Sequence, residues 1–326
     1  WEDASGGGIT GLDGLVENSS IWLGNDPSGT TSTASYNVAV GTTALDAITT
    51  GDNNSAIGYG ALSALTTQTG NTAFGYNAMN AHTGLSNTAI GYGTLAASNS
   101  TNNSVAVGYN ALAVSTTGEN VAVGASAMVA SLGGTNNVAV GKGSMAANTT
   151  GNYNVAIGNS AMATSETVSG ITAIGRNALT VMTNGATYNT AVGFDCLKTS
   201  TADTNNTAVG YTAGMTINGG DDNTLMGAAA GDAITTGNKN TAIGSQAGTA
   251  IAAGYNNTLV GMNAGASLVD SYNNTFIGMY AGDANVAAYS CTAVGYNAGS
   301  ADHGSGCTFV GEAAGKNVTG SSSYQN

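Results

Sequence analysis

Few residues of this chain could do chemistry together. Its two histidines, His82 and His303, lie about 13 repeats apart in the register described below, so they cannot form a pair within one chain. The GGDD at 219–222 could hold calcium in a turn, but the repeated GGxGxDxUx pattern of calcium-binding β-rolls is absent. The glycines of 6–11 match GxGxxG, yet no strand precedes them and about one residue in seven is Gly. Since catalysis needs convergent ionisable groups, we expect no enzyme, metal or cofactor.

Two other sets of side chains share a regular spacing. Four tyrosines follow one another at a nearly constant interval: Tyr59, Tyr76, Tyr92 and Tyr109. Cys291 and Cys307 are separated by the same interval, and Cys196 stands alone. What these residues can do depends on the elements that place them.

A repeat of about 17 residues explains this interval. Each copy ends a short apolar segment on a glycine, here called the repeat glycine, and 18 copies follow one another at spacings of 16, 17 or 18 residues. The repeat glycines are Gly24, Gly41, Gly58, Gly75, Gly91, Gly108, Gly124, Gly141, Gly158, Gly175, Gly193, Gly210, Gly227, Gly244, Gly261, Gly278, Gly295 and Gly311. We therefore predict one repeat array over 18–315, an N-terminal cap or connector over 1–17 and a C-terminal tail over 316–326.

The segment before each repeat glycine is a predicted strand. The residue one before the glycine is apolar in all 18 copies (the apolar column, for example Ile57), and we expect this column to form the core. The residue three before it is mostly Val, Thr or Ser (the threonine column, for example Thr207) and shares that face. A period of 17 fits about two short strands and two turns, which is one coil of a β-solenoid, whereas two-helix repeats need about twice that length.

Asparagine occupies the position four before the repeat glycine in 13 copies (the asparagine column, for example Asn206 and Asn240). In coils stacked about 4.8 Å apart, these amides can hydrogen-bond along the stack. A surface for glycans or ice is the functional interpretation, and a structural ladder is the one we favour.

The strand's other face is apolar too. The residue two before the repeat glycine (the alanine column) is Ala from Ala39 to Ala191, and later copies include Leu225, Phe276 and Phe309. The residue four after the glycine (the bulky column) is Leu or Met from Leu45 to Leu197 and then becomes Gly from Gly214 onward. Since bulk leaves one column as it enters the other, we infer that both pack against a common surface. A thin coil then leaves one apolar stripe open to water, which predicts a parallel homo-oligomer, most naturally a trimer.

The same register gives the cysteines and tyrosines their neighbours. Cys291 and Cys307 replace Asn in adjacent coils, with Cα atoms about 4.8 Å apart, which predicts a disulfide. Cys196 occupies a small-residue column and is a predicted buried thiol. Tyr59, Tyr76, Tyr92 and Tyr109 directly follow their glycines and would stack as an exposed strip. This strip is a candidate receptor-contact surface for saccharides, although a stabilising cross-strand ladder is the simpler interpretation.

The repeats resemble a known family. NNVAVG (136–141), YNVAIG (153–158), NNTAVGYTAG (205–214) and NNTFIGMYAG (273–282) are similar to the YadA-like head repeats of trimeric autotransporter adhesins, and to repeats of phage and viral tail-fibre shafts. The resemblance covers about residues 18–315, and the adhesin repeat is usually a little shorter. It implies an all-β, left-handed parallel β-roll of about 18 coils. It also implies a homotrimer displayed outside the cell or virion, used for attachment.

The composition of the chain limits the classes of partner that it can bind. Charged residues make up 7% of the chain and the net charge is −13, which argues against nucleic acid or an anionic membrane. Neither a signal peptide nor an apolar run of about 18 residues occurs, and the chain begins at Trp1, which favours a mature, processed or excised chain.

Two classes of function remain from the sequence. The first is an extracellular attachment protein, an adhesin head or tail-fibre shaft that presents a polar surface to a cell-surface or glycan receptor. The second is a structural subunit of a self-assembling extracellular filament whose open coil ends pair. Ice binding by the threonine column is a weaker option, because threonine beside core residues is expected to point inward.

Overall fold

The computed structural model describes residues 14–24, 30–99, 101–183, 185–301 and 304–317. The chain forms two compact units, Trp1–Tyr153 (unit 1) and Asn154–Asn326 (unit 2). The described residues of both units contain strands, turns and bends, and no helix. Each unit is a parallel β-solenoid with one coil for each sequence repeat, as the sequence predicts.

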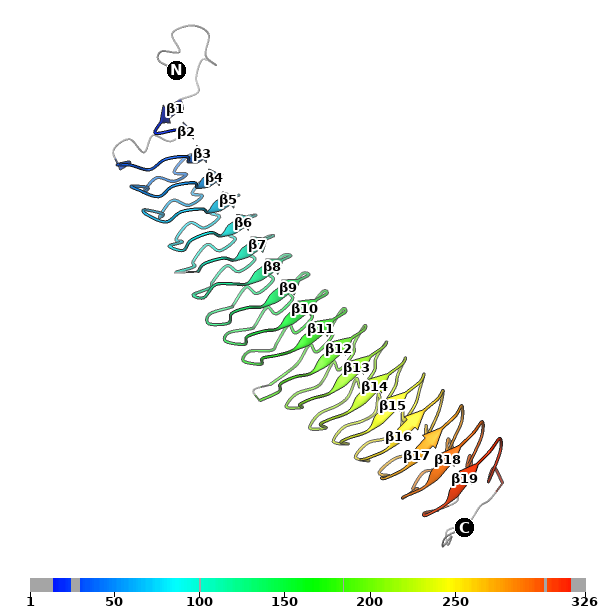
Figure 1. Ribbon diagram of the computed structural model, residues 1–326. Helices are drawn as coiled ribbons and strands as arrows, with labels where there is room; N and C mark the ends of the chain where they lie inside the picture. Colours follow the sequence, from blue (N-terminus) through cyan, green and yellow to red (C-terminus); the bar gives the residue numbers. More distant parts are fainter. Residues whose placement is uncertain (1–13, 25–29, 100, 184, 302–303, 318–326) are drawn as a thin grey trace. The chain divides into compact units, whose positions relative to one another are not determined.

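The described part of unit 1 starts with a hairpin and continues as parallel coils (Figure 1). Its strands are β1 (Gly14–Glu17), β2 (Ser20–Leu23), β3 (Val38–Val40), β4 (Ser55–Ile57), β5 (Thr72–Phe74), β6 (Thr88–Ile90), β7 (Val105–Val107), β8 (Val121–Val123) and β9 (Val138–Val140). β1 pairs antiparallel with β2, and β2 to β9 pair in parallel in chain order. β1 lies in the segment expected to cap the array, and residues 1–13 of that segment are outside the described residues.

Within the described residues, unit 2 consists of parallel coils. Its strands are β10 (Val155–Ile157), β11 (Thr172–Ile174), β12 (Thr190–Val192), β13 (Thr207–Val209), β14 (Thr224–Met226), β15 (Thr241–Ile243), β16 (Thr258–Val260), β17 (Thr275–Ile277), β18 (Thr292–Val294) and β19 (Thr308–Val310). Every neighbouring pair is in register, so each residue lies beside its counterpart in the next coil. Of the expected tail, residues 318–326 are outside the described residues.

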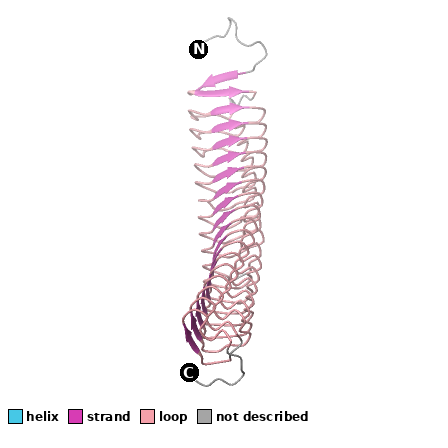
Figure 2. Cartoon of the chain, turned by 90° about the vertical axis from the view of Figure 1, so that its right-hand side faces the viewer, coloured by secondary structure: helices cyan, strands magenta, loops and turns pink. Residues whose placement is uncertain are grey.

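Each coil has one short strand, not the two strands expected from its length. Strands lie along one side of the coils, and turns and loops complete them (Figure 2). The side opposite the strand is still hydrogen-bonded from coil to coil, as between Leu45 N and Ala61 O (3.0 Å). It is not extended because residues on this side have left-handed backbone, as at Thr43 (φ 59°), Leu45 (φ 52°) and Leu62 (φ 52°).

The core lies on the opposite face of the strand from the one predicted. The alanine column is buried, with Ala39 and Ala208 both 0% exposed. The apolar and threonine columns point outward and are half-buried or exposed, as the pattern at Val38 and Val40 shows. The prediction that the apolar column forms the core is therefore wrong. Where the bulky column already fills the coil interior, only the small alanine fits beside it, and the larger branched side chains stay on the outer face.

The predicted exchange of bulk between two columns is confirmed. Leu62 and Met145 of the bulky column are fully buried in the same interior as the alanine column. Where the bulky column becomes glycine, the facing side chain fills the space. A Cβ added at Gly282 would lie 2.3 Å from the ring of Phe276. Late coils that carry leucine or phenylalanine thus place it where early coils place leucine or methionine, and the exchange is incomplete at Ala208, Ala242 and Ala293.

The asparagine column is a buried ladder. Asn240 donates through Nδ2 to Gly254 O (2.7 Å) and to Asn223 Oδ1 (3.1 Å). Its own Oδ1 accepts from the backbone N (3.2 Å) and Nδ2 (3.0 Å) of Asn257. Since Asn240 is 0% exposed, the structural interpretation of this column is confirmed and a glycan or ice surface made of these amides is excluded.

Candidate receptor-binding surface

The predicted tyrosine strip forms in unit 1. Tyr59, Tyr76, Tyr92 and Tyr109 stack in sequence with ring centroids 5.2, 5.2 and 5.3 Å apart. Their side chains are 47–55% exposed. The spacing follows from the coil register, because the backbone N of Asn77 donates to Tyr59 O (2.8 Å) beside the strip. The rings therefore stabilise one another and still offer an exposed aromatic surface.

An exposed apolar stripe runs through the same coils. Ile57, Phe74 and Ile90 of the apolar column lie two residues before the tyrosines, and Phe74 is 53% exposed. In-register coils turn such residues into a continuous column. A column of this kind is unusual on a free surface and is typical of an interface.

Unit 2 carries the longest run of the threonine column. Nine successive strands begin with threonine, from Thr172 in β11 to Thr308 in β19. These side chains lie on the outer face of the strand, half-buried in most coils. The expectation that they point inward is wrong for the same reason as for the apolar column.

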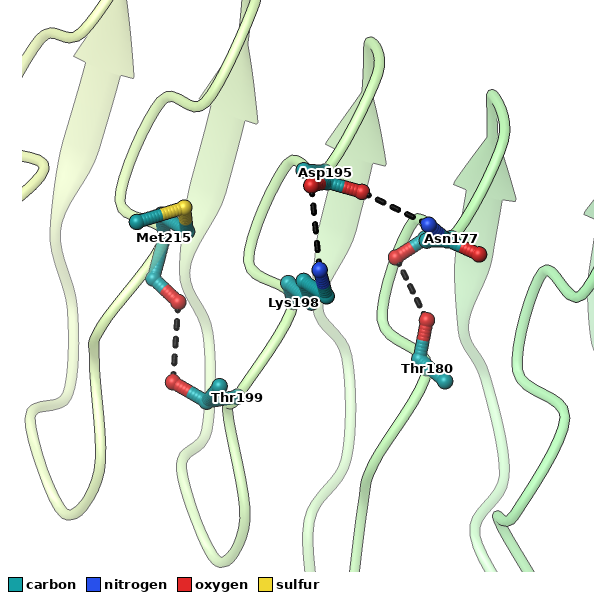
Figure 3. Close-up of polar contacts among 6 residues, drawn as sticks. All are labelled: Asn177, Thr180, Asp195, Lys198, Thr199 and Met215. Atoms are coloured by element: carbon teal, nitrogen blue, oxygen red, sulfur yellow. Dashed lines mark hydrogen bonds and ion pairs between the residues drawn. The ribbon is translucent and has the colours of Figure 1, made fainter.

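A polar network lies on the surface of unit 2 (Figure 3). Asn177 Nδ2 donates to Asp195 Oδ1 (2.8 Å), and Lys198 Nζ donates to Asp195 Oδ2 (3.0 Å). Arg176 lies over the ring of Phe194, with its Cζ 5.5 Å from the centroid. Burial opposes ionisation of Asp195, but the hydrogen bonds from Asn177 and Lys198 and the charges of Lys198 and Arg176 lower its pKa. These contacts hold Asp195 and Lys198, two of the few charged residues in this chain, in fixed positions.

The cysteines are thiols in the structure, which does not contain the disulfide predicted between Cys291 and Cys307. Cys291 makes the two donations expected of an asparagine in this column: its N donates to Asn274 Oδ1 (3.0 Å), and its Sγ donates to Gly304 O (3.2 Å). Cys307 Sγ donates to Ser305 O (3.7 Å). The in-register coils thus direct both thiols to backbone carbonyls. Cys196 is buried as predicted, and burial raises its pKa to about 12.

Acidic residues of unit 2 support the coil stacking. Asp221 Oδ1 accepts from the backbone N (2.7 Å) and Oγ1 (3.1 Å) of Thr204. Asp203 is buried, accepts from Ser200 Oγ (2.6 Å) and has its pKa raised by that burial. Within the residues that the structure describes, no group of three or more His, Cys, Asp or Glu side chains could hold a metal ion.

His82 is a buried histidine of the unit 1 core, and His303 is outside the described residues. The Nε2 of His82 lies 2.8 Å from Asn87 Nδ2, which fits a neutral ring that accepts from the amide. Burial lowers the pKa of His82 from 6.5 to about 4, against a smaller opposing effect of the Ser98 backbone.

Acidification should therefore destabilise unit 1 through His82. The unfolded chain binds a proton at His82 more readily than the folded chain does. The stability that the neutral, buried His82 contributes is therefore complete above about pH 6.5 and is lost as the pH falls to about 4. The expected loss is about 3 kcal/mol of unfolding free energy. Urea unfolding between pH 7 and pH 4 measures it. His82→Leu, which repeats the Leu65 side chain of the preceding coil, should remove that part of the pH dependence, and an unchanged profile would contradict the assignment.

A second tyrosine column, which the sequence reasoning missed, lies in unit 2. Tyr255, Tyr272 and Tyr289 each precede a repeat glycine by the same distance along the chain and stack with centroids 4.9 and 4.5 Å apart. Parallel backbone bridges join them. Their recurrence at one position of three successive repeats is the signal that could have found them.

The fold defines the chain as a β-solenoid repeat protein. No protein-family model matches it, and no curated protein sequence is significantly similar to it. The described residues form no helix of the length and apolar character needed to cross a membrane.

Proposed function

We propose that this protein is an extracellular fibrous attachment protein, an adhesin head or tail-fibre shaft that binds a cell-surface or glycan receptor. The observation that carries the proposal is the stacked, half-exposed column of Tyr59, Tyr76, Tyr92 and Tyr109. Rigid aromatic side chains bind with little loss of conformational entropy, and their polar tips suit a wet, polar receptor. No catalytic role, cofactor, nucleic acid or membrane insertion is part of the proposal.

The proposed working form is a parallel homotrimer. Its support is the apolar column on the outer strand face, where Ile57, Ile157 and Ile277 are each exposed although their neighbours in the alanine column are fully buried. Three chains that packed these faces about a shared axis would remove the columns from water. The left-handed coil stays an expectation from the resemblance to the adhesin and tail-fibre repeats.

The alternative function is a structural subunit of a self-assembling filament. One observation favours it: Phe309 in β19 is half-buried where its counterpart Phe276 is fully buried, and Val310 is 70% exposed. The outer edge of a parallel strand is a template for pairing. A filament would cover this edge with a further coil.

Binding to cell surfaces tests the proposed function. Fluorescently labelled protein should bind a panel of bacterial and animal cells selectively and saturably. The double variant Tyr59→Ser, Tyr76→Ser should lose at least about ten-fold in binding, because about 1–3 kcal/mol is typical for each stacked aromatic contact. Tyr153→Ser, a single exposed tyrosine outside the strip, is the matched control. Saturable binding that is unchanged in the double variant would rule out the strip, and an absence of saturable binding to any surface would contradict the function.

A further inference from the structure

The second tyrosine column ends beside an open pocket in unit 2. The pocket has a volume of about 530 Å³ and is lined by Asp221, Asp222, Asn238, Lys239, Tyr255 and Asn256. These residues come from the turns that precede three successive strands, β14, β15 and β16. Tyr255 is 42% exposed, so its ring is accessible from solvent.

The column leaves one face of the Tyr255 ring without an aromatic neighbour. Tyr272 stacks on Tyr255 almost in parallel, with centroids 4.9 Å apart and an angle of 4° between the rings. In the coil before Tyr255, the equivalent position holds Asn238, and in the coil before that it holds Asp221. These shorter side chains line the pocket together with Tyr255, so the pocket lies where the aromatic residues of the column end.

Polar groups surround that aromatic face. Asp222 Oδ1 accepts from Asn205 (3.2 Å) and Asn238 Oδ1 accepts from the Asp221 backbone N (2.7 Å). The second oxygen of Asp222, the amide nitrogen of Asn238 and the ammonium of Lys239 have no hydrogen-bond partner within the described part of the chain. Acceptors and donors are therefore both available at the mouth of the pocket.

We infer that this pocket binds a neutral saccharide, with one face of a pyranose ring on Tyr255 and its hydroxyl groups on Asp222, Asn238 and Lys239. A sugar combines an apolar face with a rim of hydroxyl groups, and the pocket combines an aromatic face with planar polar side chains. Two carboxylates against one ammonium at the site, in a chain of net charge −13, disfavour an acidic sugar. The inference rests on the proposed attachment function and names a receptor class for it at a site separate from the Tyr59 strip.

The test is a glycan array probed with the full-length protein. The array carries neutral glycans that end in galactose, mannose, glucose or N-acetylhexosamine, together with sialylated counterparts. Wild type should bind at least one neutral glycan, and Tyr255→Thr should weaken that binding at least ten-fold. Thr204 holds the equivalent position three coils earlier and forms the same kind of backbone bridge, so this variant should fold. Asp222→Asn, an isosteric change at an exposed residue, should weaken binding several-fold. It provides the test of the site if Tyr255→Thr does not fold.

The controls separate this site from the proposed function. Tyr59→Ser with Tyr76→Ser should retain the neutral-glycan binding within two-fold. Binding that Tyr255→Thr and Asp222→Asn leave unchanged, binding confined to sialylated glycans, or no glycan bound at all would overturn the saccharide site. If the protein still binds cells in any of those cases, the attachment function stands and only this inference fails.

Discussion

Replacing the repeat glycine Gly124 by alanine is expected to unfold its coil and to cost about 4 kcal/mol or more of unfolding free energy. Gly124 has φ 133°, which L-residues rarely adopt, and an added Cβ would lie 2.6 Å from both the carbonyl carbon and the oxygen of Gly141. Neither atom can move away, because both belong to the backbone of the next coil. Urea unfolding followed by circular dichroism measures the loss, and proteolysis should cut near residue 124.

Gly143 provides the control in the same unit. Its φ is 64° and an added Cβ meets nothing within 4 Å. The equivalent positions of other coils hold Asn77 and Asn110, both at φ 51°. Gly143→Asn should therefore change stability by less than about 1 kcal/mol. Equal losses for Gly124→Ala and Gly143→Asn would contradict the close coil stacking described here.

The second large effect is expected from Asn240→Asp, which should cost about 3–5 kcal/mol. The new carboxylate cannot donate to Gly254 O or Asn223 Oδ1, so two buried acceptors lose their donor and face a charge. The loss should shrink as the pH falls, because protonation of the introduced carboxyl removes the charge. Unfolding in urea at pH 7 and at pH 4 measures both the loss of stability and its decrease on acidification.

Asn240→Ser is the matched variant. Ser104 occupies this column in unit 1, where its Oγ accepts from Asn120 N (3.2 Å). A serine at 240 keeps an acceptor for Asn257 and should cost about 1–3 kcal/mol with little pH dependence. A serine variant as unstable as the aspartate variant at pH 7 would show that the buried negative charge adds nothing to the loss of the amide donor.

The repeat itself could be predicted from the sequence, because stacking in register demands equivalent residues in every coil. The asparagine ladder and the exchange between Phe276 and Gly282 followed from position and volume alone. Which strand face is buried could not be judged from hydrophobicity, since both faces are apolar. The size of the side chains indicates which face is buried, because Ala39 fits the limited space of the interior better than Val38 or Val40.

The remaining features could not be predicted because they depend on backbone conformation. Left-handed residues such as Thr212 and Met162 give no strong sequence signal, and they turn the expected second strand into turns. The disulfide was predicted from Cα spacing, whereas the thiol directions depend on the carbonyls beside them. The pocket beside Tyr255 required knowing where an aromatic column ends and which side chains fill the next coil.

The molar mass of the folded protein in solution tests the proposed attachment trimer most directly. Light scattering after size-exclusion chromatography should give one species near 95 kDa, about three times the chain mass of 31.7 kDa. An open-ended distribution of masses would instead favour the filament. A stable species of 31.7 kDa would contradict the packing of three outer strand faces and leave the apolar column exposed to water.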